Sequence, residues 1–150
     1  ICEGLVGSEM CIRDRSSVHS HHAGPWQPGS DHCCRSLMRV ERPWGWYEDL
    51  LAAPGYKVKR LLIRRGRQLS LQRHRHRSES WTVVSGDGAL LCGECWLEAK
   101  AGVMLTIPCG AMHRARSDQS DLVILEVQHG NDLREDDIER LQDDYGRVIN

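Results

Sequence analysis

The chain has 150 residues and a mass of 17.1 kDa, a size that suits a single domain. Its 20 Lys and Arg residues nearly balance 21 Asp and Glu residues, and this balance argues against a strongly basic nucleic-acid-binding chain. No apolar run approaches the roughly 20 residues that a membrane-spanning helix requires.

The first segment, residues 1–38, differs in composition from the remainder. It holds four of the seven cysteines and four of the eight histidines, and it shows neither helical nor strand periodicity. It also lacks the basic start and apolar stretch of a signal peptide. Met38 directly precedes the first well-patterned segment. We therefore expect residues 1–38 to be disordered or a non-native extension, and residues 39–150 to form the folded domain.

The cysteine pattern does not indicate a disulfide framework, because the total is odd and few cysteines lie in the expected domain. The three that do are Cys92, Cys95 and Cys109. This usage favours a reducing cytoplasm. Cys92 and Cys95 have the spacing of half a zinc site. However, the two residues between them, Gly93 and Glu94, fit a two-residue hairpin turn, and we expect the turn.

From residue 39 onward, short runs with strand-like alternation follow one another. Glycine-containing turns separate them at intervals typical of an all-β sandwich or barrel. In the final segment, Glu135 to Asp144, Ile138 and Leu141 have helical spacing, which predicts a short C-terminal helix with a solvated acidic face. The predicted strands are Tyr56–Arg64, Gln68–His74, Glu79–Val84, Ala89–Cys92, Cys95–Ala99, Val103–Ile107 and Leu122–Val127.

Two segments place candidate metal ligands at strand positions. Gln72 and His74 are two residues apart, so their side chains share one face of a strand. After a short loop, Glu79 begins the next strand on the parity that faces the hydrophobic interior. Further along, a turn that contains proline and glycine leads into His113 on a following strand. These amide, imidazole and carboxylate groups together suit a borderline divalent ion such as Zn, Mn, Co, Ni or Fe.

The spacing of these residues resembles the two motifs of the cupin superfamily. The first, Gly-x5-His-x-His-x(3,4)-Glu-x6-Gly, is matched from Gly66 to Gly86 with Gln72 in place of the first His. The second, Gly-x5-Pro-x-Gly-x2-His-x3-Asn, is matched from Gly102 to Ser117 with Ser in place of Asn. Two motifs in order with every spacing preserved are a strong signal. The resemblance implies an all-β double-stranded β-helix, that is, a cupin or jelly-roll barrel. The implied metal ligands are Gln72, His74, Glu79 and His113.

Segments inside and outside the two motifs narrow the resemblance to one family. They are Arg42–Gly45, Gly55–Arg60, Leu69–Gln72, Trp81–Gly86, Ile107–Pro108, His113–Arg114, Glu126–Gln128 and Glu135–Ile138. Together they resemble the type II mannose-6-phosphate isomerase domain, which usually forms the C-terminal part of bifunctional mannose-1-phosphate guanylyltransferase/isomerase enzymes. The similarity runs from about Val40 to Arg147, and Gln at the position of the first His is itself typical of this family. The chain departs from the family pattern at Arg73, Arg75 and Ser80.

This resemblance implies a metal-dependent interconversion of mannose 6-phosphate and fructose 6-phosphate, with zinc as the first expectation among the suitable metals. A proton would move between C1 and C2, and the metal ion would act as a Lewis acid on the sugar oxygens. The candidate catalytic residues are His76 and Arg77, with a water molecule at the metal as another candidate base. The candidate phosphate ligands are Lys59, Arg77 and Arg114. Residues 57–77 contain nine Lys or Arg and no acid, a distribution that would attract an anionic sugar phosphate.

Two other functions stay open at the level of sequence. His74, Glu79 and His113 alone would form a facial triad with open positions, as in iron-dependent oxygenases. The departures from the family pattern also allow a non-catalytic cupin that binds a sugar phosphate. By resemblance to cupins we expect a homodimer, and we expect neither nucleic acid nor membrane as a partner.

Overall fold

The computed structural model describes residues 38–147, and the structural statements that follow concern these residues. The chain divides into two units, Ile1–Ser36 and Leu37–Asn150, and the description below is of the second. The expectation that residues 1–38 are a disordered or non-native extension lies outside the described residues, apart from Met38. No helix among the described residues is long and apolar enough to cross a membrane.

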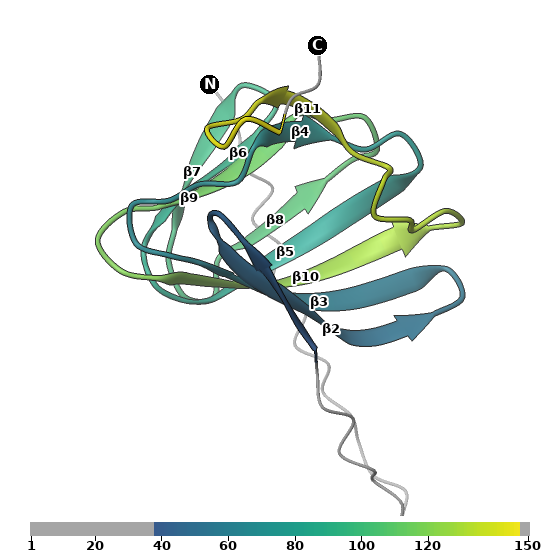
Figure 1. The fold of residues 1–150 in the computed structure, drawn as a ribbon, viewed down its shortest axis with the longest axis horizontal. Coiled ribbons are helices and arrows are strands. Elements are labelled where there is room, and N and C mark those ends of the chain that lie inside the picture. Colours follow the sequence, from purple (N-terminus) through teal and green to yellow (C-terminus); the bar gives the residue numbers. More distant parts are fainter. Residues whose placement is uncertain (1–37, 148–150) are drawn as a thin grey trace, which may run out of the picture. The chain divides into compact units, whose positions relative to one another are not determined.

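Two antiparallel β-sheets make up the described part of the chain (Figure 1). Segments far apart in sequence are neighbours in both sheets, and the chain crosses repeatedly from one sheet to the other. This architecture confirms the expected all-β double-stranded β-helix. The six-stranded sheet contains, in spatial order, β1 (Arg39–Arg42), β2 (Gly45–Ala53), β3 (Tyr56–Ile63), β10 (Leu122–Gly130), β5 (Arg77–Ser85) and β8 (Met104–Ile107). The five-stranded sheet contains, in spatial order, β11 (Glu139–Gln142), β4 (Leu71–Arg73), β9 (His113–Ser117), β6 (Gly88–Cys92) and β7 (Cys95–Ala99).

The interior between the sheets has an apolar half and a polar half. On the inner face of β10, Leu122 and Ile124 are completely buried, and Glu126 and Gln128 follow on the same face. Each fully buried aliphatic side chain contributes about 1.5–3 kcal/mol to folding. The sequence of β10 therefore places hydrophobic packing at one end of the barrel and polar groups at the other. The apolar half contains Trp44, Leu61, Ile63, Leu69, Trp81, Val83, Leu90, Ala99, Ile107, Ala115, Leu122 and Ile124.

Gly86, the last residue of the first cupin motif, follows β5 in a conformation that only glycine adopts readily. Its φ is +95°, and a Cβ atom there would lie 2.1 Å from the carbonyl oxygen of Asp121. The motif therefore ends in glycine because the start of β10 lies against this turn. The hairpin expected at Gly93 and Glu94 is also present, with Cys92 and Cys95 as directly paired residues on β6 and β7.

The C-terminal helix predicted over Glu135 to Asp144 is wrong. The segment forms a turn followed by strand β11, which pairs with β4 of the five-stranded sheet. Backbone groups in a helix bond to one another, so a helix would forfeit this pairing. It would also withdraw the Asp137 carboxylate from the backbone N–H groups of Arg75 and His76. These long-range bonds outweigh the helical spacing of two apolar residues.

Candidate metal centre

Three buried side chains converge in the polar half of the interior. His74 follows β4, Glu79 lies on β5 and His113 begins β9, and their candidate ligand atoms all lie within 4.8 Å of one another. His74 Nε2 is 3.1 Å from Glu79 Oε1, and His113 Nε2 is 3.5 Å from Glu79 Oε2. The structure therefore brings together three of the four predicted ligands.

Backbone carbonyl groups hold both imidazole rings at Nδ1. His74 Nδ1 contacts the carbonyl oxygen of Asp137, and His113 Nδ1 lies 2.9 Å from the carbonyl oxygen of Ala111. Because a carbonyl group holds Nδ1, Nε2 is the nitrogen of each ring that would ligate a metal ion beside Glu79. This is the orientation that a metal-ligating histidine requires, and the donor set fits a divalent ion.

The protonation states of the set also suit metal binding. Burial would raise the pKa of Glu79, but the hydrogen bond with His74 and the neighbouring His113 and Arg77 outweigh it and hold that pKa at about 2. Burial lowers the pKa of His113 below its ordinary value. A carboxylate and a neutral imidazole are the forms that ligate a metal ion.

Gln72 lies beside this set, opposite His113 in the pairing of β4 with β9. Its Nε2 is 3.5 Å from His113 Nε2, and its Oε1 accepts a hydrogen bond of 2.8 Å from Ser70 Oγ. The amide therefore presents nitrogen to the site, and ligation through oxygen requires the amide to turn over. The role of Gln72 as a ligand stays a prediction.

The guanidinium group of Arg77 lies directly against the same ligands. Its Nε donates to Glu79 Oε1 at 3.0 Å, and its Nη2 lies 3.2 Å from His74 Nε2. Its Nη1 donates to the carbonyl oxygen of Arg134 at 3.0 Å. Arg77 thus joins the ligand set to the segment that follows β10.

A cavity of about 110 Å³ adjoins the ligand set, and both Glu79 and Gln72 are in its wall. The ammonium group of Lys59 is buried there, bonded to Glu135 and 3.8 Å from Asp49. Positive side chains outnumber negative ones in the lining, which suits an anionic ligand. The basic residues of the wall are Arg42, Lys59, Arg77, Arg140 and Arg147, and the acidic ones are Glu79, Glu126 and Glu135.

Two predicted site residues lie outside this cavity. His76 is exposed, and its backbone N–H donates to Asp137 Oδ2 at 3.1 Å. Arg114 follows His113 on β9 and therefore faces the opposite side of the sheet, where its Nε donates to the carbonyl oxygen of Leu69 at 3.2 Å. Among the predicted catalytic and phosphate-binding residues, the structure brings Lys59 and Arg77 to the cavity.

Sequence reasoning gave no role to Glu126 and Gln128, which line the cavity from β10. Trp81 Nε1 donates both to Glu79 Oε2 at 3.2 Å and to Glu126 Oε2 at 3.0 Å, and Gln128 Nε2 donates to Glu126 Oε1 at 2.7 Å. Burial and the nearby charge of Glu79 raise the pKa of Glu126 to about 8. The sequence did contain a signal for these two residues. Glu126 and Gln128 alternate in step with Leu122 and Ile124, so they share the inward face of an otherwise apolar strand.

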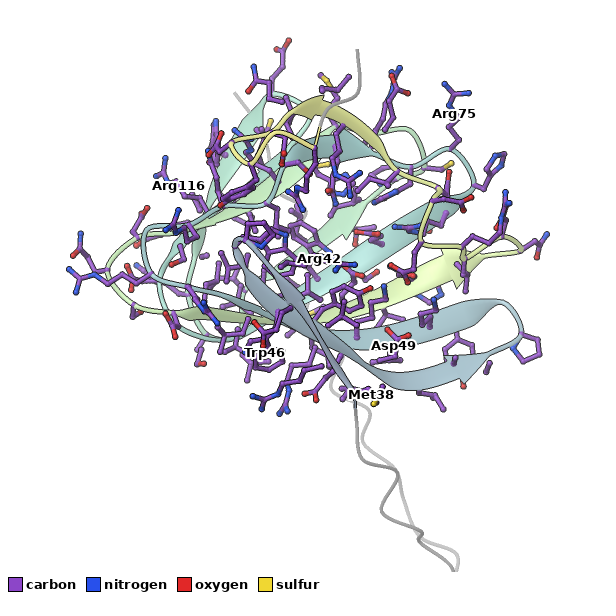
Figure 2. The ribbon with its side chains drawn as sticks, in the orientation of Figure 1. Met38, Arg42, Trp46, Asp49, Arg75 and Arg116 are labelled. Atoms are coloured by element: carbon purple, nitrogen blue, oxygen red, sulfur yellow. The ribbon has the colours of Figure 1, made fainter. Side chains whose placement is uncertain are left out.

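The segment after β10, residues 131–142, forms a strap along the polar end of the barrel and ends with β11 (Figure 1). Lys57 Nζ donates to the carbonyl oxygen of Leu133 at 3.1 Å and to Glu135 at 3.0 Å. Outside the barrel, Glu139 accepts two bonds of 2.9 Å from Arg73. It is also 3.5 Å from Arg75, which points away from the strands in Figure 2. The strap therefore binds residues from β3, β4 and β5.

Solved structures with the same architecture identify the fold as a cupin. A cupin-2 domain from Rhodospirillum rubrum superposes with a TM-score of 0.57 at 18% identity, covering 75% of this chain and 84% of that one. The capsular polysaccharide assembling protein CapF from Staphylococcus aureus gives a TM-score of 0.61 at 19% identity, covering 71% of this chain and 34% of that one. At these identities the likeness concerns the fold alone.

Sequence comparison identifies the family to which the chain belongs. The profile of the family described as "Mannose-6-phosphate isomerase C-terminal" matches residues 30–143, and the chain belongs to this family. It is 41% identical over 119 residues to the alginate biosynthesis protein AlgA of Pseudomonas aeruginosa, covering 79% of this chain and 24% of that protein. It is 37% identical over 143 residues to a mannose-1-phosphate guanylyltransferase of Escherichia coli, covering 93% of this chain and 30% of that protein. The chain thus spans a quarter to a third of the length of these relatives.

Proposed function

We propose that this chain is a metal-dependent aldose–ketose isomerase that interconverts mannose 6-phosphate and fructose 6-phosphate. The observation that carries the proposal is the buried set of His74, Glu79 and His113 beside a cavity with a predominantly basic wall. Membership of the mannose-6-phosphate isomerase C-terminal family supports the choice of substrate. Zinc is our first expectation for the metal, and Mn, Co, Ni or Fe would also suit the donor set.

His74, Glu79 and His113 would hold the metal ion, and Gln72 would join them as a fourth ligand after its amide turns over. When bound, the ion supplies Lewis-acid polarisation of the sugar oxygens. The phosphate group needs cationic donors. Lys59 and Arg77 are the two predicted donors in the cavity wall, and Glu135 now neutralises Lys59. A bound phosphate would take the place of this carboxylate as the partner of Lys59.

Proton transfer between C1 and C2 needs an acid–base group within hydrogen-bond reach of both carbons. His76 would have to move from its exposed position to reach a sugar in the cavity, and Arg77 is occupied by Glu79 and His74. The remaining polar and charged groups of the wall, among them Lys59 and Gln72, can form hydrogen bonds with the sugar phosphate. We therefore assign to Lys59 and Arg77 the binding and orientation of the sugar phosphate, and not the proton transfer.

A coupled assay of mannose 6-phosphate conversion, with the metal content measured in parallel, tests the proposal. We expect His74→Ala or Glu79→Ala to abolish turnover together with bound metal, because each removes a ligand from a buried set. Full turnover by His74→Ala would contradict the metal assignment. Oxygen uptake in place of isomerisation would identify an oxygenase, and sugar-phosphate binding without turnover would identify a binding module.

Arg77→Ala separates substrate binding from metal binding. We expect this variant to retain metal and to turn over at least tenfold more slowly, because it removes a buried phosphate donor but no metal ligand. Arg75→Ala is the matched control, since the side chain of Arg75 is exposed outside the barrel. Equal loss of activity in both variants would contradict a specific role for Arg77.

We further propose a cytoplasmic homodimer that associates through an edge strand. Strand β7 supports this proposal, because it lies at the edge of the five-stranded sheet and exposes half of Trp96. Analytical ultracentrifugation of the full chain measures the oligomeric state, and a monomer at micromolar concentration would contradict a stable dimer.

A further inference from the structure

Glu126 is a buried carboxyl group in the cavity wall that lies outside both cupin motifs. In the six-stranded sheet its direct neighbours are Lys59 on β3 and Trp81 on β5. The ammonium group of Lys59 bonds to Glu135 on the strap instead, and among residues 38–147 no cationic group forms an ion pair with Glu126. The carboxyl group is therefore available for chemistry rather than committed to a salt bridge.

Two hydrogen bonds fix the orientation of this carboxyl group. Trp81 Nε1 donates to Oε2 at 3.0 Å, and Gln128 Nε2 donates to Oε1 at 2.7 Å. Each oxygen keeps a further lone pair that no residue of the described chain occupies. Because Trp81 Nε1 also donates to Glu79 at 3.2 Å, the carboxyl group is held in a fixed relation to the metal-ligand set.

The neighbouring Gln128 indicates that the cavity beside Glu126 accommodates a ligand with a hydrogen-bond donor. Gln128 is 1% exposed and pairs in register with Glu79. Its Oε1 is buried without a hydrogen-bond partner among the described residues, while its Nε2 is occupied by Glu126. Buried acceptors are rarely left unpaired, so a ligand hydroxyl group in the cavity is the natural partner.

We propose that Glu126 is the acid–base that carries the proton between C1 and C2 of the sugar phosphate; this inference rests on the proposed function. The Glu126 carboxylate removes the proton from C2 of mannose 6-phosphate, so the C2–H bond breaks and an O–H bond forms on Glu126. The released electron pair forms the C1=C2 double bond, and the carbonyl electrons of C1 pass to O1.

The second half-reaction restores Glu126. The hydroxyl proton passes from O2 to O1, the C2–O2 carbonyl forms, and the C1=C2 electron pair takes the proton back from Glu126 to make a C1–H bond. No atom or electron is gained or lost, so no further reactant is needed. The raised pKa of Glu126 agrees with this role, since a group that both accepts and returns a proton works best near neutrality.

Glu126→Gln is the sharpest test, because glutamine keeps the size of the side chain and still accepts from Trp81 but cannot take up a proton. Mannose 6-phosphate carrying deuterium at C2 is the probe, and NMR follows the loss of deuterium from C2. We expect the variant to lose deuterium at least about a hundredfold more slowly than the parent chain, the size of a typical acid–base contribution, with metal content and KM unchanged. Glu98→Gln, an exposed position on β7, is the matched control and should behave like the parent chain.

The outcomes separate this inference from the proposed function. If the parent chain does not release deuterium from C2, the proposed function and this inference both fail. If the parent chain is active and Glu126→Gln matches it, this inference alone is overturned. Should Glu126→Gln fail to fold, Glu126→Asp keeps the carboxyl group but retracts it by one methylene group. We then expect kcat to fall at least tenfold with metal retained, and an unchanged kcat would overturn the assignment.

Discussion

At the scale of residues, backbone carbonyl groups orient the two histidines of the candidate metal centre. The carbonyl oxygens of Asp137 and Ala111 each engage an Nδ1 atom, which leaves both Nε2 atoms directed at Glu79. Metal binding therefore requires little rearrangement of the imidazole rings. The guanidinium group of Arg77 shares this space and lies 3.2 Å from His74 Nε2.

Glu126 makes the stability of the metal-free protein depend on pH. Because burial and the charge of Glu79 raise its pKa from 4.5 to about 8, the folded state holds the proton more tightly than the unfolded state. The resulting stabilisation is fully present below pH 4.5 and is lost as the pH rises to about 8. We expect Glu126→Gln to reduce this loss in urea unfolding titrations of metal-free protein. Identical pH slopes for the variant and the parent chain would contradict the prediction.

The sequence predicted that His74, Glu79 and His113 would lie close together, because the cupin motifs fix their positions relative to three strands, β4, β5 and β9. It was uninformative about Glu126, since the contacts of this residue depend on which strands flank β10. The structure also explains why the chain can depart from the family pattern at Arg73 and Arg75. Both side chains contact Glu139 of β11 on the outside of the barrel, so these substitutions leave the donor set intact.

At the scale of elements, the strap that follows β10 depends on Asp137. Its Oδ1 accepts from the backbone N–H of Arg75 at 3.0 Å, and its Oδ2 accepts from that of His76 at 3.1 Å. We expect Asp137→Ala to lower the free energy of unfolding by about 1–3 kcal/mol, because two backbone donors lose their partner. Chemical denaturation measures this change. Asp136→Ala is the control, since Asp136 is exposed and should shift stability by less than about 0.5 kcal/mol; an equal effect of both variants would contradict the assignment.

Local patterns located most strands correctly, because alternation over four or more residues is a property of the strand itself. The same method failed for residues 135–144, where the spacing of Ile138 and Leu141 suggested a helix. The structure of that segment is set by partners more than 60 positions away in sequence, namely Arg73, Arg75 and His76. No window of neighbouring residues contains that information.

At the scale of the whole molecule, the formal net charge of -1 conceals a positive cavity. Its wall contains five basic and three acidic side chains, and two of the acidic ones are the buried Glu79 and Glu126. We expect the KM for mannose 6-phosphate to rise several-fold between about 0.1 and 1 M salt, as the Debye length falls from about 10 to 3 Å. The kcat should change little, because salt screens the attraction of the free substrate rather than proton transfer within the bound complex. A KM that does not vary with salt would contradict electrostatic attraction of the substrate.

The central place of β10 in the six-stranded sheet has a consequence for the order of folding. β10 separates β3 from β5, two strands that are close together in the sequence, so neither finds its full set of partners until residues 122–130 have been synthesised. Pairings between such distant segments slow folding, since the entropy of closing long loops is lost before the contacts form. During translation, the outer hairpin of β2 and β3 can form early, whereas the barrel and its metal-ligand set close only when the last third of the chain has emerged.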